Sequence, residues 1–412
     1  MTAAALNARL RPVLPDRWSL GVSLIAILFA LPIVAVLSSV FSPSGEAWRH
    51  LVDTVLATYV INSVLLMLGV AFGVLSIGVT TAWLVTNYEF PLRRLFSWAQ
   101  LLPLAIPAYI IAYTYTGLLD YAGPVQTVLR DWFGPWISDW FPDIRSLWGA
   151  MAMLSLVLYP YVYLLARAAF LKQSVSVQDA SRLLGCNPWQ TFTLVALPMA
   201  RPAIIAGTSL ALMETLADYG TVQYFGVDTF TIGIFRTWFG LGDANAAAQL
   251  ASVLLGFVLV LVGLEVYSRR RARYHHVGSS GQPLVPVILV GWKRYLASVA
   301  CFTPLFFGFV VPFAVLAYWS LITAQDMIDE SFVSLVMHSF TLAGVTALLA
   351  VALSLFMAYG KRLRSIPSVL AAVRIAGSGY AIPGTVIAVG VLVPLAWVGT
   401  GFFWPLNYPL PL

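Results

Sequence analysis

The chain has 412 residues, of which 60% are hydrophobic and 10% are charged, with a mean hydropathy of +0.86 and a net charge of +6. Soluble domains carry about a quarter of charged residues, so this composition excludes a water-soluble protein and indicates a membrane protein. The two distant cysteines, Cys186 and Cys301, exclude a disulfide framework, and the sequence has no GxxxxGK[ST] phosphate-binding loop. We therefore expect no catalytic residue, metal site, cofactor or nucleic-acid partner.

Nine apolar stretches are long enough to cross about 30 Å of hydrocarbon as helices. The first is too long for the apolar core of a signal peptide, so we expect a retained helix. In chain order the predicted spans cover residues 19–41, 59–85, 95–118, 147–170, 202–220, 244–267, 296–321, 336–360 and 375–398. They predict an all-α integral membrane protein, a polytopic helical bundle in the lipid bilayer.

Basic residues collect on one side of the membrane when the spans alternate from a cytoplasmic N-terminus. This arrangement leaves only four of the 23 basic residues outside, namely Arg49, Arg130, Arg145 and Arg236. Cytoplasmic loops are enriched in lysine and arginine, so we expect this orientation in a bacterial inner membrane.

The loop at residues 120–146, predicted to lie outside, is acidic and aromatic. Its acidic residues form either a solvated face or an attraction for cationic cargo or a basic partner. Its aromatic residues form either an interfacial belt or a ligand site, and the belt is the simpler explanation. The residues concerned are Asp120, Asp131, Asp139, Asp143, Trp132, Phe133, Trp136, Trp140 and Phe141.

An internal repeat relates residues 61–112 to residues 337–388 at a constant offset of 276. Pro107 and Pro91 meet Pro383 and Pro367, and prolines punctuate helices. Six crossings separate the copies, so the repeats are predicted to be parallel. We expect a first half at 1–267, a basic cytoplasmic linker at 268–294 and a second half at 295–412 that holds three spans.

The loop between the fourth and fifth spans predicts two short helices at about residues 171–200. Gly185 suits a left-handed stop, and Asn187 followed by Pro188 suits the start of the next helix. Leu197-Pro198 is expected to end that helix. Such a helical loop would project from the bilayer toward a cytoplasmic partner.

This loop resembles the EAA loop of binding-protein-dependent ABC importer permeases, whose pattern is Glu-Ala-Ala, three residues, Gly and a later Leu-Pro. Here the triplet is Asp179-Ala180-Ser181, which departs at two positions, followed by Gly185 and Leu197-Pro198. The resemblance implies a type I ABC importer permease fold and a coupling helix that seats in an ATPase subunit. It also implies two partners, a cytoplasmic ABC ATPase dimer and a periplasmic or lipid-anchored solute-binding protein.

The segments around residues 212–231 and 246–251 resemble the fused permeases for ferric iron, which carry two permease halves in one chain. Ferric iron is the cargo that this resemblance implies, with thiamine, polyamines or another small solute as alternatives. Glu214 and Asp218 lie one helical turn apart in the fifth span. They either line the pathway and attract a cation, or lie at a wet helix end or paired with Arg236.

Two other classes explain the sequence less well. An ion-coupled secondary transporter predicts several charges near the midplane and leaves the 171–200 loop unexplained. A membrane enzyme predicts a convergent set of catalytic side chains, and the sequence shows none. From the offset of 276 we also expect a second coupling loop near position 455, hence a longer natural protein of about twelve spans.

Overall fold

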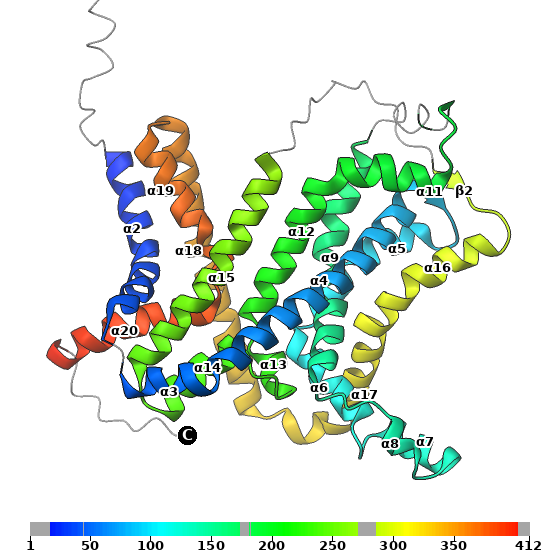
Figure 1. Ribbon diagram of the computed structural model, residues 1–412, viewed down its shortest axis with the longest axis horizontal. Helices are drawn as coiled ribbons and strands as arrows, with labels where there is room; N and C mark the ends of the chain where they lie inside the picture. The colour runs from blue at the N-terminus through cyan, green and yellow to red at the C-terminus, as the bar shows by residue number, and fades with distance from the viewer. Residues whose placement is uncertain (1–16, 44, 174–180, 182, 271–285, 403–412) are drawn as a thin grey trace, which may run out of the picture. The chain divides into compact units, whose positions relative to one another are not determined.

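The computed structural model describes residues 17–43, 45–173, 181, 183–270 and 286–402 (Figure 1). Seven helices in these ranges are long and apolar enough to cross a membrane, and two bent helix pairs raise the number to nine. They coincide with the nine predicted stretches, which confirms the multi-pass helical fold. The described residues form a single sheet, in which β1 (Tyr88–Glu89) pairs in parallel with β2 (Val287–Ile288).

The contacts divide the chain into two compact units, which are described separately. One contains residues 42–321 with 383–385, and the other contains the described residues of 1–41, 322–382 and 386–412. This grouping differs from the predicted halves because helices group by the surfaces they bury and not by chain order. The division into repeats at 268–294 stays a prediction.

Three long helices form the core of the 42–321 unit: α4 (Leu56–Asn87), α9 (Leu147–Leu171) and α12 (Leu197–Ala217), which lie side by side (Figure 1). Glycines allow their backbones to approach closely. A Cβ on Gly78 of α4 would lie 2.9 Å from the carbonyl oxygen of Tyr159, and one on Gly207 of α12 would lie 2.8 Å from Val162 Cα. Helix α9 therefore packs between α4 and α12, each of which places a glycine against it.

Shorter elements surround the far end of these helices: α3 (Glu46–Thr54), α13 (Gly220–Tyr224), α14 (Phe230–Phe235) and the π-helical turn η4 (Arg236–Gly240). Helix α15 (Ala244–Arg270) then runs back along α12. The opposite end of the unit holds the β1–β2 pair and α11 (Pro188–Gln190) (Figure 1). We call the end that holds the β1–β2 pair and α11 the loop end, and the end that holds α3, α13, α14 and η4 the far end.

The third predicted span is broken. Its first arm contains α5 (Arg93–Ala99) and the 3-10 turn η2 (Leu102–Ala105), and its second arm contains α6 (Ala108–Leu119) and α7 (Pro124–Phe133), with α8 (Ile137–Trp140) following. The arms meet at 88°. Ile106 is extended, with φ −108° and ψ 120°, because the ring of Pro107 disfavours a helical residue before it.

Helix α16 (Trp292–Leu305) continues through the π-helical turn η5 (Phe306–Val310) into α17 (Val311–Met327). Ala297, Cys301 and Leu305 of α16 share an apolar cluster with residues of α4 and α5. Buried Gln100 donates to the carbonyl oxygen of Cys301 at 2.8 Å and accepts from the Tyr159 hydroxyl at 2.6 Å. The first helix after the linker thus packs within the 42–321 unit.

The second unit contains α2 (Arg17–Ser38) with η1 (Ser39–Phe41), α18 (Glu330–Leu363), α19 (Pro367–Gly377) with η6 (Ser378–Ala381), and α20 (Gly384–Phe402). Val22 and Ala26 of α2 pack against Met357, Val369 and Ala372. Asp329 caps α18 by accepting from Phe332 N–H at 2.8 Å. The hydrogen bonds from the Ser331 hydroxyl and this N–H lower the pKa of Asp329.

The ninth predicted span is also broken, with arms that meet at 114°. Ile382 is extended before Pro383, with φ −94° and ψ 125°. The 3-10 turns at residues 102–105 and 378–381, and the helices that begin at Ala108 and Gly384, are all separated by the offset of 276. The predicted repeat therefore recurs in secondary structure, including its break.

Candidate functional site

The described part of the 171–200 loop begins at Ser181, so Asp179 and Ala180 lie outside the described residues. Gly185 has a φ of +86°, the left-handed conformation that was predicted for it. The N–H of Cys186 donates to the carbonyl oxygen of Ser181 at 3.0 Å, a bond typical of a helix that ends on a left-handed glycine. The sequence therefore located this turn correctly.

The helix after this turn starts as the sequence predicted. Asn187 accepts from the N–H of Gln190 at 2.8 Å, and its own N–H donates to Gln190 Oε1 at 2.9 Å. This reciprocal pair is a capping box, and Pro188 occupies the first helical position. The direction of α11 is therefore fixed by local contacts.

The predicted stop at Leu197-Pro198 is wrong. Helix α11, the π-helical turn η3 (Thr191–Ala196) and α12 form one run of helix from Pro188 to Ala217. A proline in a helix lacks its N–H and crowds the preceding turn, and a widened π turn directly before Pro198 accommodates both. The fifth span is therefore continuous with the loop helix.

Two buried polar contacts attach this helix to the rest of the loop end. Ser181 Oγ lies 3.0 Å from Thr191 Oγ1, at the start of η3. Gln173, just beyond α9, donates its side-chain N–H to the carbonyl oxygen of Ala196 at 2.8 Å. Gln173 was not predicted as a site residue, because a lone glutamine after an apolar stretch follows no pattern.

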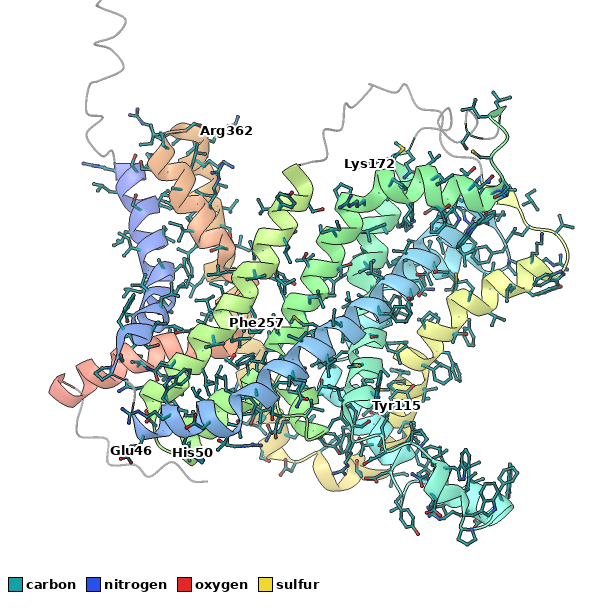
Figure 2. The ribbon with its side chains drawn as sticks, viewed as in Figure 1. Glu46, His50, Tyr115, Lys172, Phe257 and Arg362 are labelled. Atoms are coloured by element: carbon teal, nitrogen blue, oxygen red, sulfur yellow. The ribbon has the colours of Figure 1, made fainter. Side chains whose placement is uncertain are left out.

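Apolar side chains on this loop are exposed beyond the ends of the long helices. Leu183 is 89% exposed, Leu184 is 85% exposed and Trp189 is 71% exposed. Figure 2 places Lys172 at the same end and Tyr115, Glu46 and His50 at the far end. We call Leu183, Leu184 and Trp189 the coupling surface, after the coupling role that the resemblance implies for this loop.

The carboxylates Glu214 and Asp218 lie at the far-end terminus of α12. Asp218 accepts from the Thr221 hydroxyl at 2.9 Å and from the N–H of Val222 at 3.0 Å, so it caps α13. Its carbonyl oxygen accepts from the Thr231 hydroxyl at 2.8 Å. These contacts give Asp218 a structural role, and its place in the pathway stays a prediction, as does that of Glu214.

Arg236 forms an ion pair with Asp228, at 2.9 Å between Nη2 and Oδ1. The pair borders a cavity of about 330 Å³ that is also lined by Tyr219, Gln223 and Phe239. Among the described residues, no group of three or more His, Cys, Asp or Glu side chains could hold a metal ion. The cavity therefore offers mixed polar and aromatic walls without a metal-ligand cluster.

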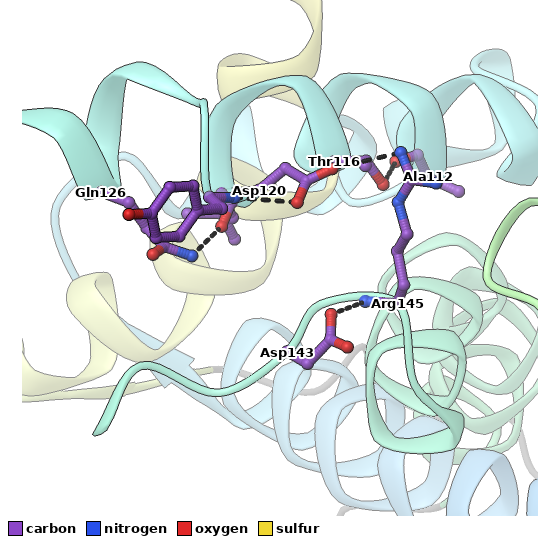
Figure 3. Close-up of polar contacts among 8 residues, drawn as sticks. Ala112, Thr116, Asp120, Gln126, Asp143 and Arg145 are labelled. Carbon is purple, nitrogen blue, oxygen red and sulfur yellow. Dashed lines mark hydrogen bonds and ion pairs between the residues drawn. The ribbon is translucent and has the colours of Figure 1, made fainter. Parts of the chain in front are cut away.

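The acidic loop at the far end is tied to the helices it connects. Arg145 pairs with Asp120 at 3.1 Å, and its N–H donates to Asp143 at 2.9 Å (Figure 3). Gln126 donates to the carbonyl oxygen of Leu119 at 2.9 Å. Asp120 and Asp143 thus anchor this loop between α6 and α9.

Residues 74–274 match the family model described as "Binding-protein-dependent transport system inner membrane component". The Fe(3+)-transport system permease protein FbpB 2 of Haemophilus influenzae is 27% identical over 391 residues, which is 92% of this chain and 72% of that protein. The sulfate permease CysT of Escherichia coli is 27% identical and covers 61% of this chain and 92% of its own. The molybdenum permease ModB of Escherichia coli is 29% identical, with 48% of this chain and 88% of its own covered.

A solved bacterial ABC transporter that imports the polysaccharide alginate has a TM-score of 0.48 and 17% identity, over 66% of this chain and 96% of that chain. The matched family segment contains α9, the coupling surface, α12 and all of α15. Residues 74–274 thus match the inner-membrane component of binding-protein-dependent transport systems, and the relatives that align with this chain are permease proteins of such transport systems.

Proposed function

We propose that this permease passes ferric iron from a solute-binding protein to the cytoplasm, driven by a separate ATPase dimer that binds the coupling surface. The relative named for Fe(3+) transport aligns with 92% of this chain, whereas the sulfate and molybdenum relatives align with 61% and 48%. The longer alignment supports iron as cargo, and it extends over both repeats.

The exposure of the coupling surface is the observation that supports contact with the ATPase. Two exposed leucine side chains just before the Gly185 turn and an exposed tryptophan on the capped helix after it form the kind of apolar patch that marks a protein interface. The patch lies at the loop end. Arg93 and Arg94, at the start of α5, and Lys172, just after α9, lie at the same end. Such basic residues favour a cytoplasmic location for this end and for the N-terminus.

Uptake into proteoliposomes tests the cargo. The permease is reconstituted with its ATPase and binding protein, and the binding protein is supplied with ferric iron, sulfate, molybdate, thiamine or a polyamine. We expect ATP-dependent accumulation of iron alone. Accumulation of another solute with no iron uptake would assign a different cargo to the same machinery.

Substitution of Leu183 and Leu184 by serine tests the ATPase contact. We expect the double variant to enter the membrane but to lose co-purification with the ATPase, because the apolar anchors of the contact are removed. The matched control is Trp148→Ser, which removes a 77% exposed side chain from α9. Normal co-purification of the Leu183/Leu184 variant would remove the basis for the coupling surface.

Gly185 gives a second test, because a Cβ there would have no atom within 4 Å. A substitution at Gly185 therefore acts through its φ of +86° and not through a clash. Asparagine tolerates this conformation and valine does not. We expect Gly185→Val to uncouple ATP hydrolysis from uptake and Gly185→Asn to preserve coupling; equal uptake by both would contradict a role for the turn.

A further inference from the structure

A chain of aromatic rings connects the coupling surface to the ends of two core helices. Trp83, near the loop end of α4, lies at a ring-centroid distance of 4.9 Å from Phe192 and 5.2 Å from Phe170. Phe192 in turn lies 5.6 Å from Trp189, which is 71% exposed. One continuous set of ring contacts therefore leads from an exposed side chain into the packed core.

Trp83 is the branch point of this ring chain. Phe170 belongs to the last turn of α9 and is fully buried, whereas Phe192 belongs to the π-helical turn η3. Trp83 also contacts Tyr88 edge-on, at 6.5 Å. Tyr88 is paired in the β1–β2 ladder with Val287, a few residues before α16. A single side chain thus contacts α9, the turn η3 that leads into α12, and β1, whose partner strand β2 precedes α16.

The polar contacts of the same region restrain η3 on either side of the rings. Ser181 holds Thr191 at the start of the turn, and Gln173 holds the carbonyl oxygen of Ala196 at its end. Buried hydrogen bonds and interlocked rings make a stiff attachment, because close-packed side chains have few alternative arrangements. The loop helix is therefore fixed to the end of α9 as well as to α12.

We propose that Trp83 is a positioning residue for energy coupling: it makes the coupling surface move as one body with the loop ends of α4 and α9. A π turn is a common site of local adjustment, so η3 alone could bend when the ATPase displaces Trp189. The contacts of Trp83 would instead pass this displacement on to the core helices. This proposal rests on the proposed function, because it assumes that the ATPase binds the coupling surface.

Trp83 could instead only stabilise the fold, and uptake per ATP hydrolysed separates the two roles. A stabilising residue changes the amount of assembled transporter, whereas a positioning residue changes how much cargo each hydrolysed ATP delivers. The measurement uses the permease reconstituted with its ATPase and with iron-loaded binding protein. Both rates are normalised to the assembled complex recovered from the vesicles.

For Trp83→Ala we expect unchanged co-purification with the ATPase, retained ATP hydrolysis and uptake per ATP that falls about fivefold, the scale of one or two lost ring pairs. Trp83→Phe should restore most of the ratio by keeping a ring in place. Trp148→Ala, at an exposed position of α9, should leave the ratio unchanged. A ratio for Trp83→Ala within the error of the Trp148→Ala control would overturn the proposal.

Phe192→Ala provides an independent route if Trp83→Ala does not assemble. It removes the ring between Trp83 and Trp189 from a partly exposed position, so we expect assembly with the same fall in uptake per ATP. An unchanged ratio for Phe192→Ala would likewise overturn the proposal. Failure of the ATPase contact itself is read separately, from co-purification of the Leu183/Leu184 variant.

Discussion

Helices α4 and α18 occupy the same place in the two repeats but pack very differently. In an apolar 18-residue window, 22% of the residues of α4 are buried, against 6% in α18. Gly69, Gly73 and Gly78 of α4 face α9, and the residues 276 positions later are Val345, Leu349 and Ser354. The same helical pattern thus serves a close-packed face in one repeat and an exposed face in the other.

This comparison separates what local sequence determines from what packing determines. Both repeats form a long helix, a 3-10 turn, an extended residue before proline and a new helix, and each of these follows from nearby residues. Close approach to a neighbouring helix requires small residues at particular positions, and α4 has glycine at all three, whereas α18 has Val345 and Leu349 at two of them.

Gly78→Leu should produce the largest effect. The new side chain would meet Val162 and the backbone at Tyr159 and Tyr163, so α4 and α9 must separate. We expect a loss of roughly 3 kcal/mol in unfolding free energy, measured by denaturant titration in detergent. Ser354→Leu in α18 is the matched control, and its exposed position should keep the change within about 0.5 kcal/mol. Equal losses at both sites would contradict the difference in packing.

Tyr159→Phe should have a smaller effect. The hydroxyl of Tyr159 donates to Gln100 in a fully buried setting, so its removal leaves the amide oxygen without this donor. We expect a loss of about 1 to 2 kcal/mol in the same titration. Adding Gln100→Leu should restore part of it, because both polar groups are then absent; an additive loss in the double variant would contradict the proposed pairing.

The sequence specified the nine spans well, because hydropathy alone decides which stretches can enter lipid. It also located the Gly185 turn and the Asn187 cap, since both depend on residues within one turn. It did not show that spans three and nine are broken, although Pro107 and Pro383 were visible, because proline is tolerated in many membrane helices.

Tertiary contacts account for the other differences. The helical run through Pro198 depends on the π turn η3. This turn is restrained by Gln173, which lies 23 residues before Ala196 in the sequence and so outside any local pattern. The packing of α16 with α4 and α5 depends on Gln100 and on an apolar cluster, neither of which has a periodic signature. Such features depend on which helix faces contact each other, and a single sequence does not reveal these contacts.

The proline substitutions Pro107→Ala and Pro383→Ala should produce the smallest effects. Each removes the restriction on the preceding isoleucine and raises the entropy of the unfolded chain, for an expected loss of about 0.5 to 1 kcal/mol. Hydrogen exchange at residues 106–110 and 382–386 should increase in parallel. A change at one break alone would show that packing, and not local sequence, maintains the other.

Disulfide or thiol cross-linking between the permease and its ATPase tests the central claim most directly. The parent carries Cys186→Ser and keeps Cys301, which is fully buried. One variant carries Leu183→Cys, on the coupling surface. The other carries Trp140→Cys, in the aromatic loop at the far end, where the tryptophan side chain is 81% exposed. We predict a cross-link to the ATPase from position 183 and none from position 140. A cross-link from position 140 alone would contradict both the coupling surface and the orientation.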